Sequence, residues 1–237
     1  MATIVLRTAA QESSEPKFIA LNQYNKPAIG GICVDIFRAI EKLTTNLRFE
    51  GDQVWMPRMR IDAHFRNNQI DVICGVQNLP RNTEHYQLLP TPLFTVNYLL
   101  AVRVDDPINP QSWDDIRRLG KEGIIMAIHG FGIVDILHNL GGLQIDAGAT
   151  SSLSNLRKLL AARGRFYCHR SPGMKAAIKS AGFEKQIRLL DQPMLSEKFY
   201  LGVRKNLASE QLKLINDALL MLDKKGELTR IFDQYRE

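Results

Sequence analysis

A nitrogen-rich group of side chains ends an apolar stretch in the sequence GRFYCHRSPG, residues 164–173. The segment RFYCH is β-prone and apolar, as expected of a buried strand, and His169, Arg170 and Ser171 follow at its end. These side chains offer hydrogen-bond donors that suit an anionic group, and His169 would bind one in a pH-dependent way. The alternatives are a strand-end histidine with satisfied hydrogen bonds and a solvated arginine.

A second donor group is predicted in the sequence HGFGIVDIL, where His129, Gly130, Phe131 and Gly132 join a strand to a helix. Backbone N–H groups at a helix N-terminus, together with the helix dipole, can hold an anion without any side chain. Glycine allows a ligand to approach the backbone closely. The alternative for this segment is an ordinary tight turn.

Composition restricts the classes of protein to consider. A chain of 237 residues suits two domains. The net charge of +6 suits an anionic ligand or simply favours solubility, and the basic residues do not form the runs typical of nucleic-acid binding. No run approaches the roughly 18 apolar residues of a membrane helix. The chain opens directly into a strand, which indicates either a cytosolic protein or one whose signal sequence has been removed.

The three cysteines, Cys33, Cys74 and Cys168, lie in apolar segments without the spacing of a metal site. We expect buried thiols, with a Cys33–Cys74 disulfide left open as an alternative.

Strands and helices alternate along most of the chain. Residues 11–30 are expected to form a turn-rich loop, Gly75 is expected to end a strand, and Ser112 with Asp115 resembles a capping box. The expected strands cover residues 3–9, 47–54, 70–76, 94–104, 123–128, 143–149, 165–169, 185–193 and 197–205. The expected helices cover 31–45, 57–68, 133–142, 151–164, 171–183 and, as one or two helices, 209–237, and residues 105–120 are expected to form a proline-marked loop and a short helix.

Five motifs in order resemble a known family. They are GGICVDIFRAIEK, HFRNNQIDVICGV, SWDDIRRLGKEGIIMAIHGFG, LRKLLAARGRF and INDALLMLDKKGELTRIFDQY, and together they extend over nearly the whole chain. The order and spacing resemble the bacterial extracytoplasmic solute-binding proteins of family 3, which serve polar amino-acid ABC transporters. A more distant resemblance is to the ligand-binding core of ionotropic glutamate receptors.

The resemblance implies a fold of the α/β class, the two-lobed type II periplasmic-binding-protein-like fold. Each lobe would be a doubly wound, mostly parallel sheet. Lobe 1 would comprise residues 1–99 and 203–237, and lobe 2 residues 100–202, with hinge crossings near Leu99–Val104 and Glu197–Val203. Such proteins bind a solute at the carboxyl ends of the strands and close the two lobes over it, in the manner of a Venus flytrap.

The resemblance also implies site residues. In lobe 1, Arg81 would bind a carboxylate, although it lies one residue short of the family's usual spacing. In lobe 2, Tyr167 and Pro172 stand where the family has acids, and no Asp or Glu occurs in residues 164–183. A desolvated ammonium group needs an anion, so the sequence argues against the standard α-amino-acid clamp. In lobe 1 the other expected ligand contacts are Gly75, Gln77 and Asn78. Trp55 and Phe94 would be apolar walls of the site or, alternatively, core residues. In lobe 2 the expected contacts are His129, Gly130, Phe131, Gly132, His169, Arg170 and Ser171.

The expected function is binding of a small, carboxylate-bearing solute, either an amino acid or another organic anion, and its delivery to the permease of an ABC transporter. The protein would be a periplasmic or otherwise extracytoplasmic monomer without a cofactor, a metal ion or a nucleic-acid partner. Alternatives are a ligand-sensing domain of a signalling system and, third, a cleft enzyme such as a dehydratase. Known catalytic motifs are absent, and only Glu12, Glu15 and Asp191 would be suspected as catalytic acids.

Overall fold

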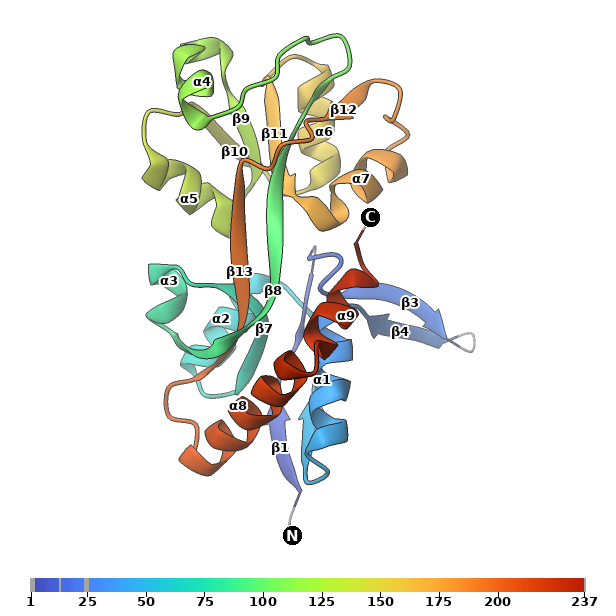
Figure 1. The fold of residues 1–237 in the computed structure, drawn as a ribbon, viewed down its shortest axis with the longest axis vertical. Coiled ribbons are helices and arrows are strands. Elements are labelled where there is room, and N and C mark those ends of the chain that lie inside the picture. Colours follow the sequence, from blue (N-terminus) through green and yellow to red (C-terminus); the bar gives the residue numbers. More distant parts are fainter. Residues whose placement is uncertain (1–2, 13, 24–25, 237) are drawn as a thin grey trace. The chain divides into compact units, whose positions relative to one another are not determined.

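The chain divides into two compact units (Figure 1). The computed structural model describes residues 3–12, 14–23 and 26–236. Unit 1 comprises Met1–Thr95 and Lys198–Arg236, and unit 2 comprises Val96–Glu197. The expected crossing at Leu99–Val104 falls inside unit 2, and the one at Glu197–Val203 spans the second division. Residues 1–2 and 237, at the ends of the expected lobe 1, lie outside the described residues.

Unit 1 contains short parallel strand pairs, and one of its antiparallel pairs joins a strand from the N-terminal part of the chain to a strand from the C-terminal part. Strands β1 (Ile4–Arg7) and β5 (Leu47–Glu50) are parallel, as are β2 (Ala10–Gln11) and β6 (Trp55–Met56). Strand β7 (Val72–Gln77) runs antiparallel to β13 (Leu195–Arg204), which returns from unit 2. The N-terminal and C-terminal parts of the chain therefore build one unit together.

The expectation of a loop over residues 11–30 was wrong. Strands β3 (Ile19–Gln23) and β4 (Lys26–Gly30) form an antiparallel hairpin there, with Ile19 opposite Gly30. The polar residues and proline of this segment have low strand propensity, and cross-strand hydrogen bonds outweigh that preference. Residues 24 and 25 lie outside the described residues.

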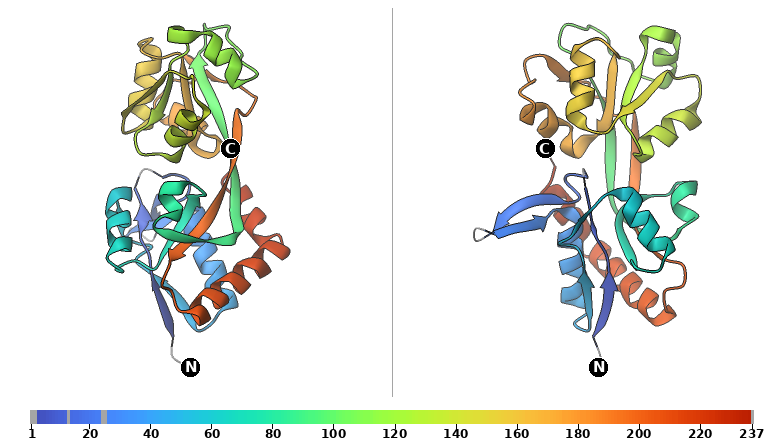
Figure 2. Two further views of the ribbon diagram at one scale, coloured as in Figure 1. Left: turned by 90° about the vertical axis from the view of Figure 1, so that its left-hand side faces the viewer. Right: turned by 180° about the vertical axis from the view of Figure 1, so that it is seen from behind.

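The helices among the described residues of unit 1 are α1 (Ile32–Leu43), α2 (Arg58–Arg66), α3 (Pro80–Thr83), α8 (Ser209–Lys224) and α9 (Glu227–Asp233). Helix α1 buries Ile32, Ile36 and Ile40, which recur at helical spacing, and packs with α8 and α9 (Figure 2). The Tyr235 hydroxyl donates to Asp35 Oδ2 at 2.7 Å. These contacts attach the C-terminal helices to the first helix of the chain.

Unit 2 is built on a sheet with the strand order β10, β9, β11, β8. Strands β10 (Ile145–Ala149), β9 (Ile125–Ile128) and β11 (Phe166–Arg170) are mutually parallel. Strand β8 (Tyr86–Arg103) runs antiparallel to β11, and β12 (Ile187–Leu189) pairs antiparallel with β8. The carboxyl ends of the three parallel strands therefore lie at one edge of this sheet. The helices of the unit are α4 (Trp113–Arg118), α5 (Gly132–Leu140), α6 (Ser152–Leu160) and α7 (Ser171–Ser180), with a 3-10 turn η1 at Gly120–Glu122.

Local sequence signals account for several helix ends in unit 2. The capping box expected at Ser112 and Asp115 is confirmed, since each side chain bonds the backbone N–H of the other residue. Ser151 caps α6 by accepting the backbone N–H of Ser154. No helix among the described residues combines the length and the apolar character needed to cross a membrane.

Two of the three cysteines form a disulfide. Cys33, at the start of α1, is bonded to Cys74 in β7, with the Cα atoms 5.8 Å apart. The sequence left this pairing open, because only the fold brings residues 41 positions apart together. Cys168 in β11 is a buried free thiol, and burial raises its pKa. The disulfide links the first helix of unit 1 to the strand that carries the candidate ligand residues.

Candidate functional site

A buried lysine in unit 1 joins Gln11, the last residue of β2, to Gly75 inside β7. Lys17 is only 4% exposed, and its Nζ donates to Gln11 Oε1 at 3.0 Å and to the Gly75 carbonyl at 3.1 Å. Few lysines in proteins are so fully buried, because removing the charge from water is costly. The sequence analysis missed Lys17 and Gln11, and a lysine in a segment interpreted as a loop gave no signal of burial.

A β-bulge at Gly75 makes room for this lysine. The pairing with β13 shifts by one residue between Val76 and Cys74, and Gly75 has a φ of +72°. A Cβ atom at Gly75 would lie 2.6 Å from Lys17 Cδ. The expectation that Gly75 ends the strand was wrong, because the bulge absorbs the left-handed residue and β7 continues to Gln77.

Gln77 supplies a buried donor at the end of β7. Its side chain is 5% exposed, and its Nε2 has no hydrogen-bond partner among the described residues. Asn82 holds the following loop in place, since its Nδ2 donates to the Gln77 carbonyl at 2.7 Å and its Oδ1 accepts from Arg58 Nη2 at 2.7 Å. An orphaned buried amide costs stability unless a ligand or water satisfies it.

The other residues predicted in this part of the chain differ in exposure. Arg81, in the short helix α3, and Asn78 are both exposed, and Trp55 in β6 is half-buried. Phe94 is buried and stacks on Phe199 and Phe232, with ring centroids 5.4 and 5.3 Å apart. Core packing accounts for the position of Phe94, and its role as a wall of a ligand site stays a prediction.

The strand ends of unit 2 bring Phe131, His169 and Arg170 together. The guanidinium carbon of Arg170 lies over the Phe131 ring, 5.4 Å from its centroid. The His169 ring is 6.0 Å from that of Phe131 and stacks on Tyr167 at 5.6 Å. Arg170 is only 6% exposed. This edge therefore presents a buried cation that is fixed against an aromatic ring.

His169 is neutral at physiological pH. Burial and, second, the charge of Arg170 lower the pKa of His169 to about 3. The expectation of a pH-dependent anion contact near neutrality was therefore wrong. The sequence shows a histidine at a strand end but does not show that neighbouring rings remove it from water.

The remaining predicted residues of unit 2 lie at the same strand ends. His129 is exposed, and its backbone N–H donates to the Ala149 carbonyl at 2.8 Å. Gly130 has a φ of +76° with open space around it, which permits close approach of another group. Gly132 opens α5 and Ser171 opens α7, so two helix N-termini flank the edge.

The suspected catalytic acids gain no support from their surroundings. Glu12, Glu15 and Asp191 are all exposed to solvent. Burial raises the pKa of Glu197 in β13, which the sequence analysis did not single out. In the part of the chain that the structure describes, no three His, Cys, Asp or Glu side chains gather closely enough to hold a metal ion.

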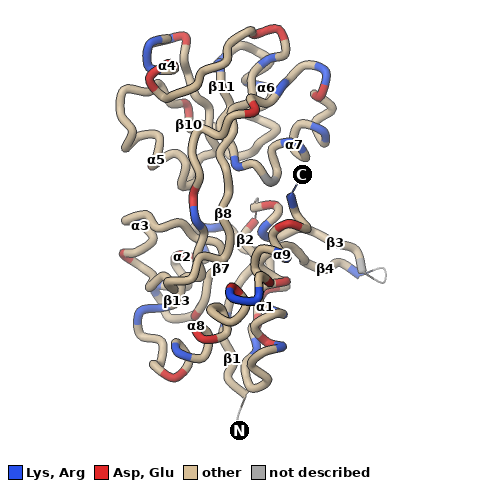
Figure 3. The backbone as a smooth tube through the Cα atoms, viewed as in Figure 1, with Lys and Arg blue, Asp and Glu red and all other residues tan. Residues whose placement is uncertain are grey.

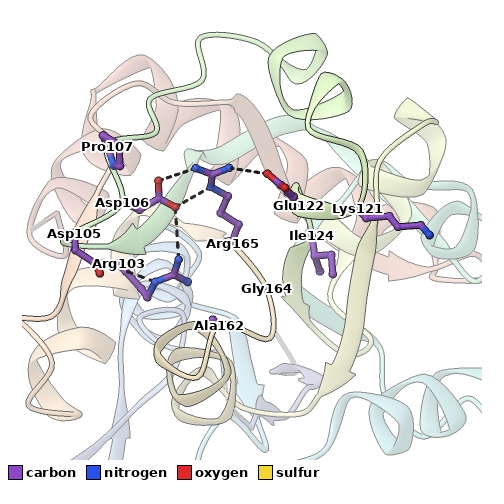
Figure 4. A pocket seen from close by; sticks show the side chains of 10 residues that line it. All are labelled: Arg103, Asp105, Asp106, Pro107, Lys121, Glu122, Ile124, Ala162, Gly164 and Arg165. Atoms are coloured by element: carbon purple, nitrogen blue, oxygen red, sulfur yellow. Dashed lines mark hydrogen bonds and ion pairs between the residues drawn. The ribbon is translucent and has the colours of Figure 1, made fainter.

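A separate pocket of about 440 Å³ in unit 2 is lined by charged side chains that pair with one another (Figure 4). Asp106 accepts two hydrogen bonds from Arg165, at 2.8 and 2.9 Å, and one from the Ile108 backbone N–H at 3.0 Å. The hydrogen bonds from Arg165 hold the pKa of Asp106 below its usual value. Arg165 precedes β11, so this pocket adjoins the amino end of that strand, whereas ligands of parallel sheets bind at the carboxyl ends.

Charge alone does not single out a surface. Figure 3 shows Lys and Arg interspersed with Asp and Glu along both units. The two edges described above differ from the rest because their cations, Lys17 and Arg170, are buried.

Known proteins match this chain by three-dimensional structure and not by sequence. No protein-family model matches the sequence, and a search of curated proteins finds no match. Solved structures do match. A putative binding component of an ABC transporter from Wolinella succinogenes, complexed with lysine, is 14% identical, with 98% of this chain and 95% of that chain covered and a TM-score of 0.75.

Two further structures extend the comparison. An amino acid ABC transporter substrate-binding protein from Streptococcus pneumoniae, bound to L-arginine, is 15% identical, covers 99% of this chain and 94% of its own, and has a TM-score of 0.73. A histidine kinase sensor domain with similarity to periplasmic binding proteins is 18% identical, covers 98% and 95%, and has a TM-score of 0.74. The chain thus has the α/β type II periplasmic-binding-protein-like fold and matches, over its whole length and at low identity, structures of substrate-binding proteins of amino-acid ABC transporters.

Proposed function

We propose that this chain is a substrate-binding protein of an ABC transporter and binds a small, polar, carboxylate-bearing solute. The observation that carries the proposal is a set of hydrogen-bond donors at the carboxyl ends of the strands in each unit. Gln77 supplies a buried amide in unit 1, and Arg170 supplies a guanidinium in unit 2. In folds of this kind, hinge motion of two units encloses a solute between such strand ends.

The proposed contacts follow from donor chemistry. In unit 1, Gln77 would hydrogen-bond a polar group, and the exposed Arg81 would bind a carboxylate, which a guanidinium can engage with two parallel N–H groups. In unit 2, the backbone from Gly130 to Gly132 would add N–H donors at the start of α5. Asn78, Trp55, His129 and Ser171 would complete the site from the same strand ends.

The disulfide supports an extracytoplasmic location. Protein disulfides persist in oxidising compartments such as the periplasm, whereas cytosolic thiols are kept reduced. Cys33 and Cys74 are buried beside the candidate edge of unit 1, where the bond holds α1 against β7. A periplasmic monomer that delivers its solute to a membrane permease is consistent with this arrangement.

A thermal-shift screen of amino acids, dicarboxylates, opines and aromatic acids tests the proposal. A true ligand at 100 times its dissociation constant stabilises the folded protein by about 2.7 kcal/mol. We expect at least one carboxylate in the panel to raise the melting temperature. Absence of any shift across the panel would contradict the proposed function.

Substitution then tests the proposed role of Arg81. Arg81→Ala should weaken binding of the identified carboxylate by about 10-fold or more. Arg66→Ala, at an exposed arginine in α2, is the matched control and should leave the affinity unchanged. Equal affinities of the two variants and the wild type would remove Arg81 from the site.

A ligand-sensing domain is the second candidate, because a histidine kinase sensor domain matches the fold over 98% of this chain. Deletion of the protein from its host separates the two functions. Loss of solute uptake supports the transporter role, whereas retained uptake with loss of a transcriptional response to the solute supports the sensor.

A further inference from the structure

A pocket on the flank of unit 2 is lined by three basic side chains. It has a volume of about 470 Å³, and its walls come from the end of β10, from helix α6 and from the turn that follows α6. Strand β10 is the edge strand of its sheet. A volume of this size is typical of small-molecule sites. The residues proposed above to contact a solute do not line this pocket.

The fold of α6 brings the basic residues of this pocket together. Ser154, Arg157 and Lys158 are three and four positions apart, so they lie on one face of the helix. Ala162 has a left-handed φ of +54°, which turns the chain at the end of α6. The backbone N–H of Arg163 then donates to the Lys158 carbonyl at 3.0 Å, and Arg163 returns to the same pocket.

Lys158 has an acid as its partner. Its Nζ donates to Asp146 Oδ2 at 2.5 Å, and the Gly148 backbone N–H donates to Asp146 Oδ1 at 2.9 Å. The hydrogen bond from Lys158, above all, holds the pKa of Asp146 below its usual value. Asp146 is therefore ionised at neutral pH and balances the charge of Lys158.

Arg157 and Arg163 have no such partner. Both are exposed, and within the part of the chain that the structure describes neither guanidinium makes a hydrogen bond or an ion pair. Arg118 and Arg165 of the same unit, by contrast, each pair with an acid. Residues 147–183 contain no Asp or Glu. Two like charges that line one pocket repel each other, and an anion bound between them would remove that repulsion.

The chemistry of the pocket suits a phosphate group better than a carboxylate. A guanidinium binds an oxyanion through two parallel N–H groups, and a phosphate group has enough oxygens to engage two guanidiniums at once. A phosphate monoester carries a charge of roughly −1.5 to −2 at pH 7, which matches two arginines. The exposed hydroxyls of Thr150 and Ser154 line the same pocket and can add hydrogen bonds.

We propose that this pocket binds a phosphate monoester. Arg157 and Arg163 would share the phosphate group, and Thr150 and Ser154 would hydrogen-bond its remaining oxygens or the organic part. The Ser154 backbone N–H is already taken by Ser151, which caps α6, so the phosphate would be held by side chains. This site goes beyond the proposed function, because no residue assigned to the carboxylate solute takes part in it.

Isothermal titration calorimetry of the full chain in a phosphate-free buffer tests the site. The probes are inorganic phosphate and glycerol 3-phosphate, and sodium chloride at the same ionic strength is the control. We expect both probes to saturate one site per chain, with the ester bound at least as tightly as the ion. Absence of saturation by both probes would overturn the proposal. Saturation by inorganic phosphate alone would mean an adventitious ion only, and would overturn the assignment of an ester.

Substitution assigns the two arginines. Arg157→Met and Arg163→Met should each weaken binding of glycerol 3-phosphate by about 10-fold, because each removes a charge-assisted contact. Arg118→Met is the matched control and should bind as the wild type does, since Arg118 is an exposed arginine of unit 2 that already pairs with Asp115. Circular dichroism without ligand checks that each variant folds.

The arginine side chains also give a direct signal. In NMR spectra of the wild type, the Nε–H signals of Arg157 and Arg163 should shift as glycerol 3-phosphate is added, whereas that of Arg118 should not. Unchanged affinity in both arginine variants, or signals that stay in place, would overturn the assignment. The carboxylate solute is measured separately, so failure of the phosphate site leaves the proposed function standing.

Discussion

Reduction of the disulfide should lower the stability of unit 1 by a predictable amount. Cys33 and Cys74 are separated by 41 positions. In the chain-entropy treatment a loop of that size, once opened, adds roughly 13 cal/mol/K to the entropy of the unfolded chain, or about 4 kcal/mol at 25 °C. For a protein of this size that corresponds to a fall in melting temperature of about 8–16 °C.

The assay needs a signal from unit 1 alone. The chain has two tryptophans, Trp55 in unit 1 and Trp113 in unit 2, so Trp113→Phe leaves Trp55 as the reporter. Urea unfolding followed by Trp55 fluorescence, with and without dithiothreitol, should show the loss. Cys33→Ala with Cys74→Ala should unfold like the reduced protein and gain nothing from oxidising conditions.

Cys168→Ala is the matched control, since Cys168 is a free thiol in unit 2. This variant should keep the full sensitivity to dithiothreitol. Thiol titration of the denatured, unreduced wild type should find one thiol among its three cysteines. Three titratable thiols, or an unfolding midpoint that dithiothreitol leaves unchanged, would refute the reasoning.

Three further changes follow from the structure. Gly75→Ala should lower the free energy of unfolding of unit 1 by about 1–3 kcal/mol, measured by urea unfolding, because alanine is strained at a φ of +72° and its Cβ would lie 2.6 Å from Lys17 Cδ. Gly182→Ala is the control and should cost less, because Gly182 has a similar φ but open space around it. Burial would raise the pKa of Asp71, but hydrogen bonds from Arg7 outweigh burial and hold the pKa below its usual value. Ionised Asp71 therefore stabilises the fold above about pH 4, and this stabilisation is lost as the pH falls further. In Asp71→Asn the unfolding midpoint should fall less steeply with decreasing pH in this acid range than it does in the wild type. His169, with its pKa lowered to about 3, should show no titration by NMR between pH 5 and 8 in the folded protein, and a titration midpoint near pH 6.5 would contradict its burial. The folded protein should lose stability as the pH falls below about 6.5, because there His169 of the unfolded chain takes up a proton.

Most elements of the fold were predictable from periodicity and turn signals. The apolar residues Ile32, Ile36 and Ile40 marked α1 because their spacing is helical, and Ser112 with Asp115 marked the start of α4. The β3–β4 hairpin was missed because its residues have low intrinsic strand propensity. Its pairing depends on contacts across the strands, which a single-sequence pattern does not contain.

The candidate site was less predictable than the fold. His169 and Arg170 were found because polar residues at the end of an apolar strand are conspicuous. The neutrality of His169 follows from burial by Phe131 and Tyr167, which the sequence does not place beside it. Lys17 was missed because its Nζ bonds Gln11 and the carbonyl of Gly75 at the bulge, and the contact with Gly75 joins residues 58 positions apart, which a single-sequence pattern does not show.

Calorimetric titration of the purified protein with the best solute from the screen tests the central claim most directly. The account predicts saturable binding of one carboxylate-bearing solute per chain, with affinity reduced by Arg170→Met and unaffected by Arg118→Met. Failure of every carboxylate to bind, or binding that both substitutions leave equally strong, would contradict it.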